Sequence, residues 1–144
     1  MGKRRLSREL AIQFLYLADM NEGDRFHQLS QFWEDHSQPM EVQSFTEEIL
    51  SHIFDHQKDI DAQLEKYSDN WTLSRMTVID RNLLRMAASE ILYSKNVPPK
   101  VAIDEAVEIA KRFGSEDSPN FINGILDRVL KELKPGTPQP SLNQ

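Results

Sequence analysis

The sequence predicts an all-α protein of six or seven helices, arranged as two small bundles that share one core. Apolar residues recur at spacings of three and four along most of the chain, and this spacing is the period of one helix face. Alternating β-branched runs between turn residues, which would indicate strands, are missing. The acid-rich first half and the more balanced second half suggest two bundles, and short connections favour antiparallel neighbours.

The first three helices are expected from their start and stop signals. Ser7 is a candidate N-cap for the first helix, which carries an apolar stripe and fades near Asn21. A short second helix ends before Pro39. A long third helix follows, with a bend expected over residues 55–58 and a break at residues 69–70.

The later helices have equally clear boundaries. Thr72 is expected to cap a single turn, and a fourth helix covers about residues 77–93. A fifth helix covers about residues 100–113, with Gly114 where a left-handed C-cap glycine belongs. Ser118 is a candidate N-cap for the sixth helix, because a proline follows it at the first helical position.

Length and composition indicate one helical domain over residues 1–134, followed by a disordered tail over residues 135–144. A chain of 144 residues can bury a core without a metal or a disulfide, and it contains no cysteine. The tail is rich in Pro, Gly, Ser and Asn. No apolar run approaches the roughly 18 residues of a membrane span, and no signal peptide is recognisable. We therefore expect a cytoplasmic protein without membrane contact.

The charge is unevenly distributed. The net charge is −6, but residues 19–69 carry thirteen acidic and three basic residues, whereas the rest carries fourteen basic and ten acidic. Four cations crowd the first eight residues: Lys3, Arg4, Arg5 and Arg8. Phosphate binding depends on the local field rather than on the total charge. A small basic patch on an acidic body is therefore compatible with nucleic-acid binding.

The basic N-terminus has two interpretations. We expect Lys3, Arg4 and Arg5 just outside the first helix and Arg8 one turn inside it. They could form a solvated helix start, although cations oppose the helix dipole there. Alternatively, an Arg-rich arm can follow a phosphate backbone and become ordered on binding.

Two acidic or histidine-containing clusters are better explained by helix structure than by chemistry. Glu48, His52, His56 and Asp59 share one helical face, but they lack the HExxH pattern of a zinc site and fit a solvated face. Asp104 and Glu105 suit the first turns of a helix. Glu108 can pair with Lys111 or Arg112. No P-loop, dinucleotide or nucleophile-elbow motif is present. We expect no enzyme activity, no cofactor and no metal.

The start of the fourth helix and the region before the sixth contain further candidates. Asp80 suits an N-terminal helical turn, Arg81 fits either an ion pair or phosphate contact, and Arg85 favours an ion pair. Gly124 lies inside a helix, where glycine costs about 1 kcal/mol relative to alanine, so a close helix crossing is expected there. Phe121 is either a core aromatic or, if exposed beside the basic arm, a stacking platform for a base.

Two segments carry a family resemblance. Residues 80–127 begin DRNLLRMAASEIL and continue VPPKVAIDEAVEIAKRFGSEDSPNFINGILD, and the N-terminus reads KRRLSRELAIQFLY. The chain resembles the bacterial transcription antitermination factor NusB family from Lys3 to about Val129. One departure is that Leu6 and Ser7 interrupt the run of basic residues, which is often more contiguous in the family.

The resemblance implies a non-enzymatic RNA-binding adaptor. It would pair with NusE, a small-subunit ribosomal protein, bind the single-stranded boxA element of nascent ribosomal RNA, and suppress termination within an RNA polymerase antitermination complex. It implies partner contacts at Tyr16 and Asp80. The RNA contacts would be Lys3, Arg4, Arg5, Arg8, Arg81, Asp117 and Phe121, with the Asp117 carboxylate at the edge of the surface repelling phosphate.

Alternative functions come from other classes. The same helical domain is found at the front of ribosomal RNA cytosine methyltransferases, so a stand-alone domain of that type is one alternative. An RNA-independent helical scaffold is another. The apolar residues Phe32, Trp33 and Phe54 also leave room for a homodimer that competes with partner binding.

Overall fold

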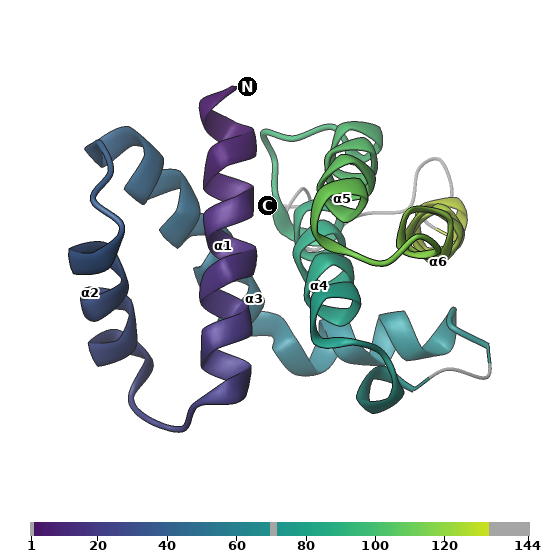
Figure 1. Ribbon diagram of the computed structural model, residues 1–144. Coiled ribbons are helices and arrows are strands. Elements are labelled where there is room, and N and C mark those ends of the chain that lie inside the picture. The colour runs from purple at the N-terminus through teal and green to yellow at the C-terminus, as the bar shows by residue number, and fades with distance from the viewer. Residues whose placement is uncertain (1, 70–71, 133–144) are drawn as a thin grey trace.

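The computed structural model describes residues 2–69 and 72–132, which form six α-helices and one short 3-10 helix (Figure 1). The elements are α1 (Lys3–Met20), α2 (Arg25–Asp35), α3 (Met40–Lys66), η1 (Leu73–Arg75), α4 (Val78–Tyr93), α5 (Pro99–Phe113) and α6 (Ser118–Glu132). No strand occurs in this part of the chain, so the all-α prediction is confirmed. No helix among these residues is both long and apolar enough to span a membrane. The expected tail lies outside the described residues.

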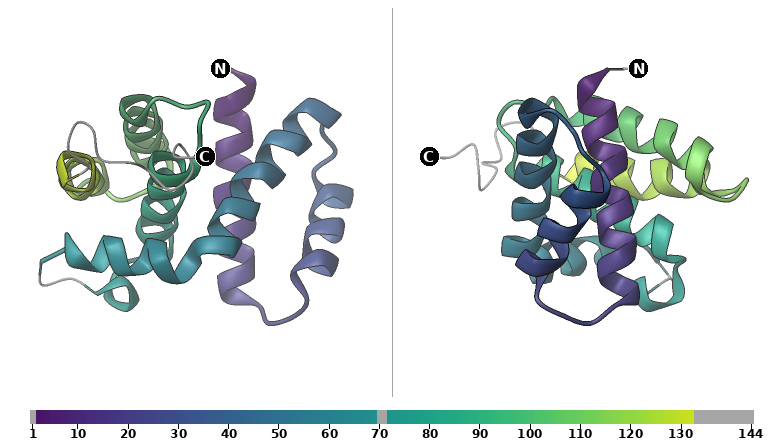
Figure 2. Two further views of the ribbon diagram at one scale, coloured as in Figure 1. Left: turned by 180° about the vertical axis from the view of Figure 1, so that it is seen from behind. Right: turned by 60° about the vertical axis from the view of Figure 1, so that its left-hand side comes forward.

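The helices form two groups that meet at α1 and α3. In Figure 1, α1 stands between α2 on one side and α4, α5 and α6 on the other. Figure 2 shows from behind that α3 crosses the back of α1 and then turns beneath the second group. The main packing partners agree with this view, because α3 packs on both α1 and α4, while α5 packs on α4 and α6. One continuous hydrophobic core joins the groups.

The bend in α3 is the point at which this helix passes from one group to the other. His56 departs from helical geometry, with φ −126° and ψ 19°, inside the segment where the sequence predicts a bend. Its ring stacks on Tyr93 at the end of α4, with 3.8 Å between the ring centres. Apolar residues on either side, Ile53 and Ile60, are fully buried. The bend therefore allows one helix to contribute core residues to both groups.

The start of α1 differs from the prediction. The helix begins at Lys3 and not after Ser7, so the first cations belong to its first turn. Ser7 is wrong as an N-cap because it is buried in the interface with α3. Its hydroxyl donates to the carbonyl of Val42 at 3.0 Å, and the Thr46 hydroxyl donates to the same carbonyl at 2.8 Å. A serine at this position provides a small polar contact between two closely packed helices.

The sequence predicts a cap at Thr72, but the threonine that caps a helix is Thr77. The Thr77 hydroxyl accepts a hydrogen bond from the Asp80 amide at 3.1 Å, which confirms the start of α4. Thr72 makes no side-chain cap to η1, and its hydroxyl lies instead 3.2 Å from that of Ser74.

Gly114 is required for space and not for a left-handed backbone. Its φ of −94° and ψ of −172° are extended, so the prediction of a left-handed cap is wrong. A Cβ at this position would lie 2.6 Å from the Ser118 hydroxyl oxygen and 2.9 Å from the Ala110 carbonyl oxygen. The Ser118 hydroxyl accepts from the Ser115 amide at 2.9 Å. The helix α6 begins at Ser118, so the predicted N-cap position of Ser118 is wrong. Its hydroxyl instead stabilises the connection before the helix.

Gly124 lies at an exposed position of α6. No heavy atom outside its own helix backbone comes within 4 Å of a Cβ built on it. The predicted close helix crossing is therefore wrong, because α6 packs through the opposite face, with Ile122, Ile125 and Leu126 buried.

The two glycines should respond oppositely to alanine. Gly124→Ala should raise the free energy of unfolding by about 1 kcal/mol, because alanine is the better helix former and finds open space. Gly114→Ala should lower it, because the new methyl group meets a backbone carbonyl. Urea unfolding of both variants measures the difference. Stabilisation by alanine at residue 114 would contradict the close-approach explanation.

Candidate RNA and partner interfaces

The first turn of α1 directs three cations to the surface. The Lys3 ammonium lies 2.9 Å from the Glu41 carboxylate, and both side chains are exposed. The Arg4 guanidinium lies over the Phe45 ring, 4.5 Å from its centre, and forms no ion pair within the described residues. Arg5 donates from Nε and Nη2 to the two carboxylate oxygens of Glu105, at 2.9 and 2.7 Å. We call Lys3, Arg4 and Arg5 the basic turn.

Arg8, one turn further, has a different environment. Its side chain is 3% exposed, as is that of Glu90 on α4, and its Nη2 lies 2.8 Å from Glu90 Oε1. Burial raises the pKa of the Glu90 carboxyl, against the hydrogen bonds from Arg8, which lower it. The pair with Glu90 uses Nε and Nη2 of Arg8, and Nη1 faces Glu105 at the wall of a groove. RNA contact by Arg8 stays a prediction, whereas its role in joining α1 to α4 is visible.

Carboxylates of α1 and α5 complete this set of ion pairs. Glu9 is buried and accepts from Arg112 Nη1 at 3.1 Å. Glu105 lies between two arginines, because Arg8 Nη1 is 3.7 Å from its Oε1. The hydrogen bond from Arg5 lowers the pKa of the Glu105 carboxyl, and burial opposes this less strongly.

A shallow groove of about 400 Å³ adjoins the basic turn. Arg4 and Arg5 line one side of it, and the connection between α4 and α5 contributes the other side through Asn96, Val97 and Pro98. The groove thus combines guanidinium groups, the Glu105 carboxylate, one amide side chain and an apolar wall. No motif in the sequence singles out this connection. The signal available was the lysine on either side of it, at residues 95 and 100.

The candidate residues at the start of α4 are engaged within the protein. Arg81 Nη2 lies 3.4 Å from the Asp19 carboxylate. Arg85 pairs with Asp61, from Nε to Oδ1 at 2.8 Å, as the sequence predicts. Asp80 is 8% exposed, and its Oδ1 has no hydrogen-bond partner in the structure. Arg81 is therefore half-buried in a bridge to α1, and Asp80 offers little surface to a partner by itself.

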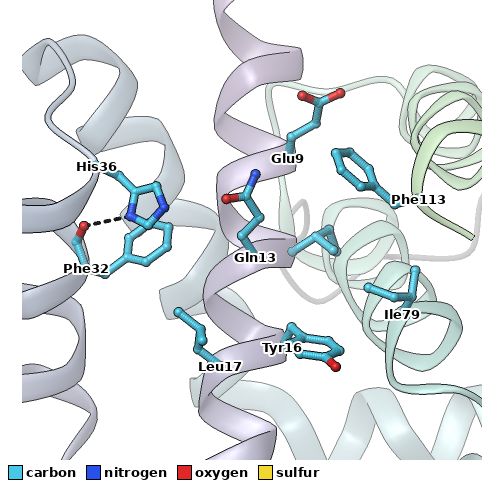
Figure 3. A pocket seen from close by; sticks show the side chains of 9 residues that line it. Glu9, Gln13, Tyr16, Leu17, Phe32, His36, Ile79 and Phe113 are labelled. Carbon is cyan, nitrogen blue, oxygen red and sulfur yellow. Dashed lines mark hydrogen bonds between the residues drawn. The ribbon is translucent and has the colours of Figure 1, made fainter.

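A mainly apolar groove of about 350 Å³ surrounds Tyr16. Figure 3 shows Tyr16 and Leu17 on α1, with Phe32 on the α2 side and Ile79 and Phe113 on the other side. Tyr16 and Leu17 are 42% and 45% exposed. Contiguous exposed apolar side chains rimmed by polar groups are typical of protein-binding sites. The groove therefore provides the surface that the prediction for Tyr16 requires.

The apolar residues that suggested a homodimer are largely inside the protein. Phe32 is 2% exposed and stacks edge-on against Phe14. Trp33 and Phe54 are half-buried and pack against the core. A homodimer built on these three side chains therefore has little surface to use.

Phe121 and Asp117 lie apart from the groove beside the basic turn. Asp117 is exposed, and its carbonyl accepts from the Phe121 amide at 3.1 Å. Phe121 is half-buried and lines a groove of about 450 Å³ with residues 67–69 and one face of α6. Arg128 borders this groove and donates to Asp69 Oδ1 at 2.8 Å. This groove shares no lining residue with the groove at the basic turn. Base stacking by Phe121 stays a prediction.

The remaining polar clusters show no metal-binding arrangement within residues 2–69 and 72–132, where no group of three or more His, Asp or Glu side chains converges. Glu108 bonds to the Lys111 ammonium at 2.8 Å, as the sequence predicts.

Acidification should weaken the contribution of Glu105 to stability. Its pKa is lowered in the folded state from an ordinary value of 4.5, so its stabilisation is present above that value and is lost as the pH falls through the folded pKa. Glu105→Gln should therefore reduce the free energy of unfolding at pH 7, and the difference from the unsubstituted protein should shrink as the pH falls through the folded pKa of Glu105. Denaturant unfolding at several pH values measures this. A difference that persists unchanged into acid would contradict the assignment.

Comparison with known proteins identifies a single family. The model of the NusB family matches residues 5–131. A transcription antitermination protein NusB of Elusimicrobium minutum is 44% identical over 141 residues, covering 94% of this chain and 99% of that protein. One from Desulfitobacterium hafniense is 46% identical, covering 90% and 89% of the two chains.

Solved structures agree in fold. A structure of T. maritima NusB covers 100% of this chain and 99% of its own, with a TM-score of 0.80 and 32% identity. A structure of the antitermination factors NusB and NusE in complex with double-stranded RNA gives a TM-score of 0.82 at 22% identity, covering 92% of this chain and 98% of that chain. At that identity the likeness concerns the fold alone.

Proposed function

Since the chain belongs to the NusB family, we propose that it is an RNA-binding antitermination factor that acts together with the ribosomal protein NusE. The pair binds single-stranded boxA-type RNA of nascent ribosomal transcripts and joins the RNA polymerase complex that resists termination. The observation that carries this proposal is the basic turn, because its three cations lie at the surface beside a groove of about 400 Å³. Relatives that match over almost their whole length favour this function over a methyltransferase fragment.

The basic turn supplies the electrostatic part of RNA binding. Phosphate contacts provide most of the affinity of proteins for nucleic acids and make it dependent on salt. Arg4 is the cation best placed for a first contact, since it has no carboxylate partner among the described residues. The apolar wall of Val97 and Pro98 lies opposite and offers a base a surface away from water. Phe121 and Asp117 would meet a longer RNA at a second, separate place.

Removing the basic turn should reduce the salt dependence of RNA binding. Replacing Lys3, Arg4 and Arg5 by Ala removes about three phosphate contacts, so the slope of log affinity against log salt should fall by roughly 2 for single-stranded RNA. Fluorescence anisotropy with a boxA-type RNA, at several salt concentrations, measures the slope.

The control variant has the same change of charge: three exposed lysines elsewhere, at residues 58, 111 and 131, are replaced by Ala. This variant should leave the slope of log affinity against log salt nearly unchanged. Equal slopes for both triple variants and the unsubstituted protein would contradict RNA binding by the basic turn and favour the helical scaffold.

The apolar groove at Tyr16 is the proposed binding site for NusE. Aromatic side chains at the centre of an interface commonly contribute much of the binding free energy. Asp80 does not line the groove, but it lies next to Ile79, which does. Asp80 would then affect NusE binding indirectly, because its buried carboxylate lies in the first turn of α4 and helps to position Ile79.

Truncating the groove should weaken the complex with NusE. Tyr16→Ala and Phe113→Ala should each reduce affinity about tenfold, which corresponds to the loss of one well-packed interface aromatic. Phe26→Ala is the control, because Phe26 is 85% exposed on α2 but lies outside the groove. Calorimetric titration of each purified variant with NusE measures the three affinities. A loss with Phe26→Ala alone would place the partner on α2.

A further inference from the structure

Glu105 holds the phosphate-binding edge of Arg5 in the free protein. The two side chains meet through two parallel hydrogen bonds, from Nε at 2.9 Å and from Nη2 at 2.7 Å. This is the edge of a guanidinium that fits the oxygens of a carboxylate or a phosphate equally well. Arg5 is nevertheless 35% exposed, so the pair lies at the wall of the groove and not in the core.

The basic turn is therefore largely neutralised by the protein itself. Lys3 faces Glu41, and Arg5 faces Glu105, whereas Arg4 has only the Phe45 ring. Both side chains of the Lys3–Glu41 pair are exposed, so Glu41 competes weakly, because such pairs are screened by water and salt. The Glu105 side chain is 19% exposed, so its hold on Arg5 is the one that RNA must overcome.

Glu105 also has a second arginine within reach. Arg8 uses Nε and Nη2 to bind Glu90, which leaves its Nη1 directed toward Glu105, 3.7 Å from Oε1. A small rotation of the Glu105 side chain would close this distance to a hydrogen bond. The carboxylate can thus leave Arg5 without losing all contact with a positive charge.

We propose that Glu105 occupies the place on Arg5 that an RNA phosphate takes in the complex, and that it shifts to Arg8 when RNA binds. This inference rests on the proposed RNA-binding function and adds an internal competitor to it. The free protein then holds Arg5 in an ordered position without presenting its full charge. Chance contacts with other polyanions are correspondingly weaker.

The test compares two substitutions of equal charge on α5. Glu105→Gln removes the competitor, whereas Glu108→Gln removes a carboxylate three residues later that bonds to Lys111 and not to Arg5. Anisotropy titrations use a short single-stranded boxA-type RNA with NusE present at low salt. Glu105→Gln should tighten binding up to about fivefold, the size expected for one partly exposed ion pair, and clearly more than Glu108→Gln. The gain should shrink as salt is added.

Two further variants make the result specific. Combining Glu105→Gln with Arg5→Ala should abolish the gain, because the gain depends on the released guanidinium. Glu105→Asp keeps the charge on a shorter side chain, so it should also release Arg5 and tighten binding, and it serves if the glutamine variant does not fold. Thermal melting establishes that each variant is folded.

The outcomes separate this inference from the proposed function. If the unsubstituted protein binds no RNA with NusE present, the proposed function fails. If it binds RNA but Glu105→Gln binds equally or more weakly, Glu105 positions Arg5 for RNA and the competitor model is overturned. Equal gains from Glu105→Gln and Glu108→Gln would overturn it as well, because they would indicate a general change in field.

Discussion

Arg8 and Glu90 form an ion pair inside the core, where each side chain is only 3% exposed. Such a pair is costly to desolvate and is strongly destabilising when one partner is lost. The pair joins α1 to α4, at the boundary between the two groups of helices. The Arg8–Glu90 pair thereby sets the orientation of the helix that carries both the basic turn and Tyr16.

The first helix contributes to the core and to the two proposed interfaces through different turns. Its first turn exposes Lys3 and Arg4, its middle buries Leu10 and Phe14, and its last turns expose Tyr16. The helix is continuous over these residues, so the proposed RNA and partner surfaces are held on one rigid element. Binding of a protein at one end can support RNA binding at the other without a change of fold, since both surfaces are already in place.

Local signals in the sequence predicted much of this fold, and long-range contacts account for what they missed. Helical spacing predicted the elements correctly, because it depends on residues a few positions apart. The exposure of Gly124 follows from helical spacing, because the apolar stripe of Ile122, Ile125 and Leu126 places residue 124 on the opposite face. The buried state of Arg8 depends on a residue 82 positions away, about which periodicity gave no information. The groove at Asn96 was missed for the same reason, because it forms only when α1 and the α4–α5 connection come together.

A double-mutant cycle on Arg8 and Glu90 tests the central claim most directly. Urea unfolding would be measured for Arg8→Met, Glu90→Met and the double variant, using methionine to fill similar space without charge. If the pair joins the two groups of helices, each single change should cost roughly 3–5 kcal/mol, because a buried charge is left alone. The double variant should then lose much less than the sum. Additive losses, or single losses below about 1 kcal/mol, would contradict the account.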